Sequence, residues 1–171
     1  MINRPQTNEY GPYYEKYISL MTESDIRDAL AAQPAELRAV LDGVPEEKGA
    51  FAYAPGKWSI KELLSHLLDG ERIFAYRVLR ISRGDATPIE GFEQDDYITN
   101  SNANNRTFSS LLDEFELQRR SNLLMLENVD DMASTRMGTA SESPVSARAI
   151  VYILGGHIRH HMTILKERYL A

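Results

Sequence analysis

The chain contains no cysteine among its 171 residues. This absence excludes disulfide bonds, a metal site built on thiolates and a cysteine nucleophile, so any thiol chemistry must arrive with a substrate. The sequence also lacks an apolar run near the roughly 20 residues that cross a bilayer, and its first residues lack the basic and then apolar pattern of a secretory signal. We therefore expect a cytoplasmic protein with no membrane partner.

Positive charge is scarce as well. The 19 lysines and arginines are outnumbered by 25 aspartates and glutamates, which leaves a formal net charge of −6. Nucleic-acid affinity depends mainly on neutralising phosphates, so this balance argues against a DNA or RNA partner. A hydrophobic share of 43% and a charged share of 26% are typical of a globular protein. The length predicts a single domain over residues 1–171.

Helical spacing of apolar residues dominates the rest of the chain. The clearest helix start is a capping box, in which Ser59 is followed three residues later by Glu62. Pro144 and Ser146 suit the first turn of the last helix. The pattern predicts four helices, at about 24–42, 59–82, 107–128 and 145–169.

The segments between these helices contain no run with strand periodicity. Residues 1–20 are rich in tyrosine and should form an irregular arm that packs on the body. Residues 84–104 form a long crossover between the second and third helices, and residues 130–143 are predicted to be irregular. The expected fold is all-α, a four-helix bundle with one long crossover, in which the first helix pairs with the second and the third with the fourth.

Three of the four histidines lie in the segment Gly-Gly-His-Ile-Arg-His-His, residues 155–161. Helical spacing puts His157 and His161 one turn apart on the apolar face. Burying an unpartnered imidazole costs on the order of 1–3 kcal/mol, so each needs a polar partner. His66 lies on the inward face of the second helix, and bundles build metal sites from facing side chains. The pattern predicts a three-histidine metal site with an open position, or else three core histidines that bond to neighbours.

Other polar residues lie near these faces. Asp69 and Glu71 follow His66, and a carboxylate can orient a ligating histidine through its second ring nitrogen. Arg77 and Arg119 fall near inward faces and could bind an anionic substrate. The alternatives are solvated carboxylates and arginines that pair with acids at the edge of the core.

Two stretches resemble a known family. The run APGKWSIKELLSHLLDGERIFAYR at 54–77 and the run GHIRHH at 156–161 are similar to the DinB/YfiT-like superfamily of metalloprotein-like bundles, which is unrelated to the polymerase of the same name. The resemblance implies an up-down-down-up four-helix bundle, usually a homodimer. It also implies a divalent metal, nickel or zinc, held by His66, His157 and His161.

The resemblance and the residues together predict a metal-dependent enzyme with a small-molecule substrate. Two reactions fit, transfer from a low-molecular-weight thiol cofactor and hydrolysis, because a tris-histidine metal can activate either a thiol or water. The alternative is a non-catalytic, metal-binding dimeric module related to stress.

Overall fold

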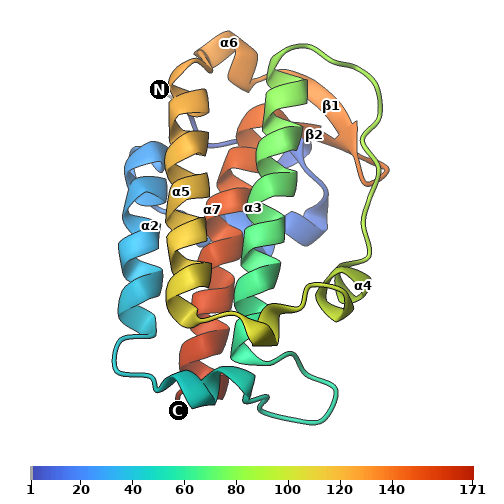
Figure 1. The fold of residues 1–171 in the computed structure, drawn as a ribbon. Helices are drawn as coiled ribbons and strands as arrows, with labels where there is room; N and C mark the ends of the chain where they lie inside the picture. The colour runs from blue at the N-terminus through green and yellow to red at the C-terminus, as the bar shows by residue number, and fades with distance from the viewer. Residues whose placement is uncertain (1) are drawn as a thin grey trace.

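Four long helices form a bundle in the computed structural model, which describes residues 2–171 (Figure 1). In Figure 1, α2 and α7 run from the top of the view to the bottom, whereas α3 and α5 run upward. In chain order one helix is followed by two that run the opposite way and a fourth that reverses again, which is the up-down-down-up arrangement. The all-α bundle predicted from the sequence is confirmed. The helices are α2 (Ile26–Val40), α3 (Ile60–Ser82), α5 (Phe108–Glu127) and α7 (Ala147–Ile164).

The predicted pairing of neighbours is wrong. α3 packs against α5 and α7, and α2 packs against the same two helices, so α2 and α3 lie diagonally opposite each other. The connection over residues 41–59 contains the short 3-10 helix η3 (Glu46–Ala50) and crosses the end of the bundle. Every long helix has an apolar face, so hydrophobic spacing alone does not choose its neighbours. The extensive contact between α3 and α7 is the one that matters for the histidines.

The helix starts follow local sequence chemistry. The Ser59 hydroxyl accepts a hydrogen bond from the Glu62 backbone N–H at 3.1 Å, and the Glu62 carboxylate accepts one from the Ser59 N–H at 2.7 Å. This confirms the predicted capping box. Ser146 caps α7 by accepting from the Ala149 N–H at 3.0 Å. Pro144 lies in a strand instead of the first turn of α7.

A small antiparallel hairpin occupies part of the segment predicted to be irregular. It consists of β1 (Met137–Ala140) and β2 (Ser143–Ser146), and it follows the short helix α6 (Asp131–Ser134). Four-residue strands are too short to show a periodic pattern, and the crossover supports this hairpin. The Ile89 N–H donates to the Thr139 carbonyl at 2.9 Å, and the Ser141 N–H donates to the Ile89 carbonyl at 2.9 Å. The crossover also contains α4 (Gln94–Thr99) and η4 (Ala103–Asn105).

The N-terminal arm packs on the body of the bundle, as predicted, and contacts α7 there. The prediction that the arm is irregular is wrong for residues 7–18, because short helical segments make up most of this stretch. The arm contains η1 (Thr7–Glu9), η2 (Pro12–Tyr14) and α1 (Glu15–Ile18). Gly156 permits this contact, because a Cβ atom there would lie 2.0 Å from the Tyr17 carbonyl oxygen. Arm and helix therefore meet backbone to backbone.

The core consists of two apolar clusters that lie one above the other along the bundle. Each long helix passes from one cluster to the other, and at least one buried polar residue of each helix falls near the point of change. α7, for example, has Leu154 in one cluster and Ile158 in the other, with His157 between them. We call this level the polar layer. It comprises Gln33 of α2, His66 and Glu71 of α3, Arg119 and Asn122 of α5, and His157 of α7.

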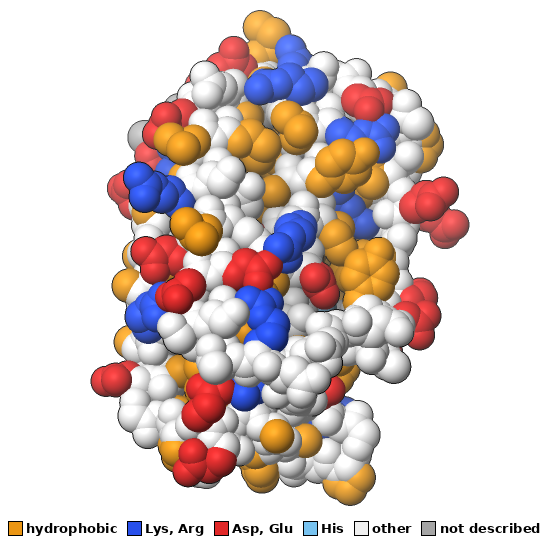
Figure 2. Space-filling view, in the orientation of Figure 1, with side chains coloured by type: hydrophobic (Ala, Val, Ile, Leu, Met, Phe, Trp, Pro, Cys, Tyr) orange, Lys and Arg blue, Asp and Glu red, His pale blue; other side chains and the backbone are white. Residues whose placement is uncertain are grey.

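The outer surface carries charges of both signs. Acidic and basic side chains are interspersed on the face shown in Figure 2, and Glu114 of α5 pairs with both Arg72 and Arg106. Among residues 2–171, none of the helices combines the length and apolar character that crossing a bilayer requires. After α7 the chain continues into a π-helical turn, η5 (Leu165–Tyr169).

Candidate metal centre

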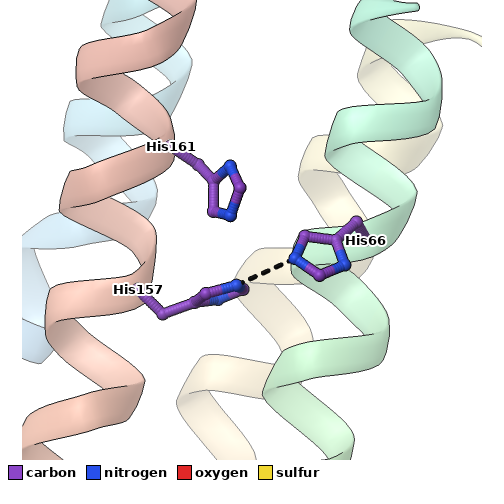
Figure 3. Close-up of side chains that lie close together, drawn as sticks. All are labelled: His66, His157 and His161. Atoms are coloured by element: carbon purple, nitrogen blue, oxygen red, sulfur yellow. Dashed lines mark hydrogen bonds between the residues drawn. The ribbon is translucent and has the colours of Figure 1, made fainter. Parts of the chain in front are cut away.

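The structure brings the three predicted histidines together from two helices (Figure 3). The Nε2 atoms of His66 and His157 lie 2.9 Å apart, and each of the three residues offers a ligand nitrogen within 4.8 Å of the others. Two nitrogens that bind one zinc ion at its usual bond length lie roughly 3.3 Å apart. The observed separations fall on both sides of that value, so small rotations of the rings would complete a coordination site.

Burial keeps all three imidazoles neutral. It lowers the pKa of His66 to about 4 and that of His161 to about 2, and it holds the pKa of His157 well below its usual value. The neighbouring histidines lower the pKa of His157 and His161 further. A neutral imidazole has a free lone pair, which is the form that binds a metal.

The hydrogen bonding within the triad is incomplete. His66 and His157 share one contact between nitrogens, and Nδ1 of His161 is buried with no hydrogen-bond partner. Buried polar atoms are usually paired, so this orphaned nitrogen needs an explanation. A cation bound by three converging lone pairs fits the donor set, and His66, His157 and His161 could therefore hold a metal.

Aromatic rings hold the imidazoles in place. Trp58 lies beside His66 with ring centroids 4.8 Å apart, and Phe74 and Tyr17 approach His157 at 5.5 and 5.6 Å. Gly70 makes room for His157, because a Cβ atom at that position would lie 3.0 Å from the Cε1 atom of the ring. The ring positions are thus set by packing from α1, α3 and the segment before α3.

Two cavities reach the triad. His66 and His157 line one of about 570 Å³, bounded also by the arm and the crossover. His161 lines a second of about 340 Å³, together with Trp58 and Asp95. Both have the size of small-molecule sites, so the open side of the triad faces space that a substrate can occupy.

Arg77 is the predicted accessory residue that the structure places beside the triad. It lines the same cavity as His66 and His157. Its Nη2 atom donates to the Ser141 hydroxyl oxygen at 2.9 Å and to the Glu90 carbonyl at 3.1 Å. The other three accessory residues, Asp69, Glu71 and Arg119, lie elsewhere.

Glu71 points toward Arg119 of α5 instead of toward the triad. Both of its oxygens accept hydrogen bonds from the buried Arg119 guanidinium, at 2.8 and 2.7 Å, and Asn122 donates a third bond. Arg119 is therefore an ion-pair partner, which is the alternative considered for it from the sequence. Asp69 lines a separate cavity beside Arg72, and burial raises the pKa of its carboxyl group.

Sequence reasoning did not assign a role in the site to three other residues. Tyr17 packs on both His157 and His160, Ser141 lies against Arg77, and Asp95 lines the cavity at His161. The negative charge of Asp95 acts to raise the pKa of His66, against the larger effect of burial. The cluster of tyrosines in the arm was the one available signal, because so many aromatics in a short segment indicate a packed surface.

Comparison with known proteins agrees with this architecture. The sequence model of the DinB superfamily matches residues 29–165, a range that includes all three histidines. The structure is similar to that of YfiT from Bacillus subtilis, with a TM-score of 0.77 and 14% identity, over 96% of this chain and 90% of that chain. YfiT is described as a probable metal-dependent hydrolase with an unusual four-helix bundle topology. At this identity the likeness concerns the fold. A search of curated proteins finds no match.

Proposed function

This chain belongs to the DinB superfamily, and from that membership we propose that it is a metal-dependent hydrolase that acts on a small molecule. The observation that carries the proposal is the convergence of three neutral imidazoles beside a cavity of about 570 Å³. The description of YfiT as a probable metal-dependent hydrolase supports the same reaction class.

His66, His157 and His161 would hold the metal, and zinc or nickel suits three imidazole ligands. Three protein ligands leave a coordination position open, which is the pattern of catalytic sites and not of structural ones. When bound, the metal supplies Lewis acidity that activates water and polarises the bond to be cleaved. Asp95 lines the cavity at His161, and its carboxylate would accept the proton that water loses during hydrolysis.

Elemental analysis of protein purified without added metal tests the site. We expect close to one zinc or nickel ion per chain, and a loss of most of it in His66→Ala and His161→Ala. His160→Ala is the matched control, because His160 is adjacent in sequence but packs on Tyr17 outside the ligand set. Metal far below one equivalent in the wild type, unchanged in all three variants, would overturn the proposal.

A panel of small esters and amides tests the reaction, with the metal-loaded protein assayed with and without an added low-molecular-weight thiol. Product formed without thiol supports hydrolysis. Product that forms only when thiol is present would contradict hydrolysis and assign the chain to thiol S-transfer. Stoichiometric metal with no turnover of any compound would contradict both reactions in favour of a non-catalytic metal-binding module.

A further inference from the structure

We propose that Arg77 binds an anionic group, a carboxylate or a phosphate, in the cavity beside the histidine triad. The substrate of the proposed hydrolase would then be a small molecule with its reacting bond at one end and a negative charge at the other. The identity of the substrate rests on the proposed function, whereas anion binding by Arg77 does not.

Arg77 is a buried charge without a counter-ion. It is 3% exposed, and none of the ion pairs among residues 2–171 involves it. Its Nε atom is buried and has no hydrogen-bond partner. A buried guanidinium is costly unless it is paired, so the missing carboxylate indicates that an anion is supplied from outside the protein.

Arg119 provides the internal comparison. It is also buried, at 1% exposed, but the protein supplies its carboxylate from Glu71 at 2.7 Å. Both side chains are thus almost fully excluded from solvent. Of the two, Arg77, which lines the cavity, is the one without a carboxylate partner.

The guanidinium of Arg77 is held in position on one edge. Nη2 donates to the Ser141 hydroxyl and to the Glu90 carbonyl. Ser141 lies in the two-residue loop of the β1–β2 hairpin, where a positive φ is the usual turn geometry. The planar, forked donors of arginine match carboxylate and phosphate oxygens.

The distance to the triad suits a short substrate. Gly70, Phe74 and Arg77 follow one face of α3, and His157 packs against Gly70. Seven residues of helix span about 10.5 Å, and long side chains lean back toward the helix N-terminus, which shortens the gap. The Phe74 ring lies between the triad and Arg77, with its centroid 5.5 Å from that of the His157 ring and 5.9 Å from Cζ of Arg77.

One acidic side chain, Glu93, lies among the residues that line this cavity. It is exposed and forms no ion pair with Arg77 among the described residues. None of the other residues that line the cavity is a lysine or an arginine. Arg77 is therefore the cationic group that a ligand meets.

Titration calorimetry on metal-free protein tests anion binding directly, with adipate and inorganic phosphate as the anions and adipamide as the neutral control. We expect the wild type to bind at least one anion and not adipamide, and Arg77→Met to weaken that anion at least tenfold. The two anions distinguish a carboxylate site from a phosphate site. Arg83→Met is the matched control, because it removes the same charge from an exposed position at the end of α3.

Two milder variants keep the test decisive if Arg77→Met fails to fold. Arg77→Lys retains the charge but loses the forked donors, and Ser141→Ala removes the contact that orients the guanidinium. Each should weaken the anion several-fold. Failure of the wild type to bind either anion, or equal affinity in all variants, would overturn the proposal.

Matched esters separate this proposal from the proposed function. For metal-loaded protein, Arg77→Met should lower the ratio of kcat/KM for mono-4-nitrophenyl adipate to that for 4-nitrophenyl hexanoate at least tenfold. A ratio that Arg77→Met leaves unchanged would remove Arg77 from substrate recognition while hydrolysis stands. Hydrolysis of neither ester would count against the function, and the calorimetry would still decide on Arg77.

Discussion

Two clusters of polar side chains, one around Glu71 and one around His66, differ in how many of their buried atoms have hydrogen-bond partners. Around Glu71, the Arg119 guanidinium donates to both carboxylate oxygens, to the Leu30 carbonyl at 3.0 Å and to the Gln33 side chain at 2.6 Å. Gln33 in turn donates to the Gly155 carbonyl at 2.8 Å. Around His66, five residues earlier on the same helix, three imidazoles share one contact and leave a nitrogen orphaned.

This difference distinguishes a cluster that stabilises the fold from one that is suited to bind a ligand. Both clusters are buried, and both cross between helices far apart in the sequence. No buried side-chain nitrogen or oxygen of the Glu71 cluster lacks a hydrogen-bond partner, so the cluster fixes the packing of α2, α3 and α5. The histidine triad does not complete its hydrogen bonding. Its three neutral rings share one contact between nitrogens, and Nδ1 of His161 has no hydrogen-bond partner. Burial alone therefore does not identify a binding site. A buried cluster whose polar atoms lack hydrogen-bond partners is the stronger indication.

Breaking the Glu71 cluster should give the largest effect. Glu71→Leu leaves the Arg119 guanidinium buried without its carboxylate, so we expect a loss of about 3–5 kcal/mol in the free energy of unfolding. Urea denaturation followed by circular dichroism measures it. The double variant Glu71→Leu with Arg119→Met removes both charges and should recover much of the loss. A single variant as stable as the wild type would mean that the cluster does not hold the bundle together.

The histidine triad should respond in the opposite way. Without metal, His161→Leu removes a desolvated imidazole with an orphaned nitrogen, so stability should change by less than about 1 kcal/mol in either direction. Metal at a hundred times its dissociation constant should stabilise the wild type by about 2.7 kcal/mol, and this variant hardly at all. Denaturation with chelator and with zinc gives both numbers. A metal-free His161→Leu protein that loses several kcal/mol would erase the contrast with Glu71.

A third cluster, at the junction of the arm with α7, should give a smaller effect that depends on pH. Glu9 accepts hydrogen bonds from Arg148 and Ser146, and its pKa falls from 4.5 to about 2, chiefly through the Arg148 hydrogen bond. A folded pKa below the unfolded value means that the stabilisation is complete above about pH 4.5 and is lost as the pH falls toward 2.

The advantage of the wild type over Glu9→Gln should therefore be about 1.5–2 kcal/mol near neutral pH and should shrink steadily in acid. Urea denaturation of both proteins at a series of pH values measures it, and subtracting the two curves removes the contribution of other titrating groups. A difference between the proteins that stays constant from pH 7 to pH 2 would show that the Glu9 charge does not stabilise the fold.

The features that the sequence predicted well depend on local spacing. The capping box at Ser59 and the facial alignment of His157 and His161 follow from helix periodicity, which requires no knowledge of the rest of the fold. The convergence of His66 with that pair needed one further assumption, that its helix lies beside the last one. That assumption was right, although the pairing of α2 with α3 from the same scheme was wrong.

The features that the sequence missed depend on contacts between distant segments. The guanidinium of Arg77 is positioned by a hydrogen bond to Ser141, which lies 64 positions away in the sequence. Ser141 is in the turn of a hairpin whose strands are too short to be recognised from the sequence. Glu71 was a candidate partner of His66 because the two are close in sequence. A helix turns by 100° at each residue, however, and this carries Glu71 round to Arg119. Proximity along a helix is a poor guide to direction.

The separation of the metal-site residues along the chain has a consequence for how the protein matures. His66 leaves the ribosome 91 residues before His157, so α3 alone offers a single imidazole, too little to retain an ion. The ring packing around His157 also requires the arm to be seated over Gly156. Any metal that the three histidines hold together must therefore bind after α7 has docked against α3.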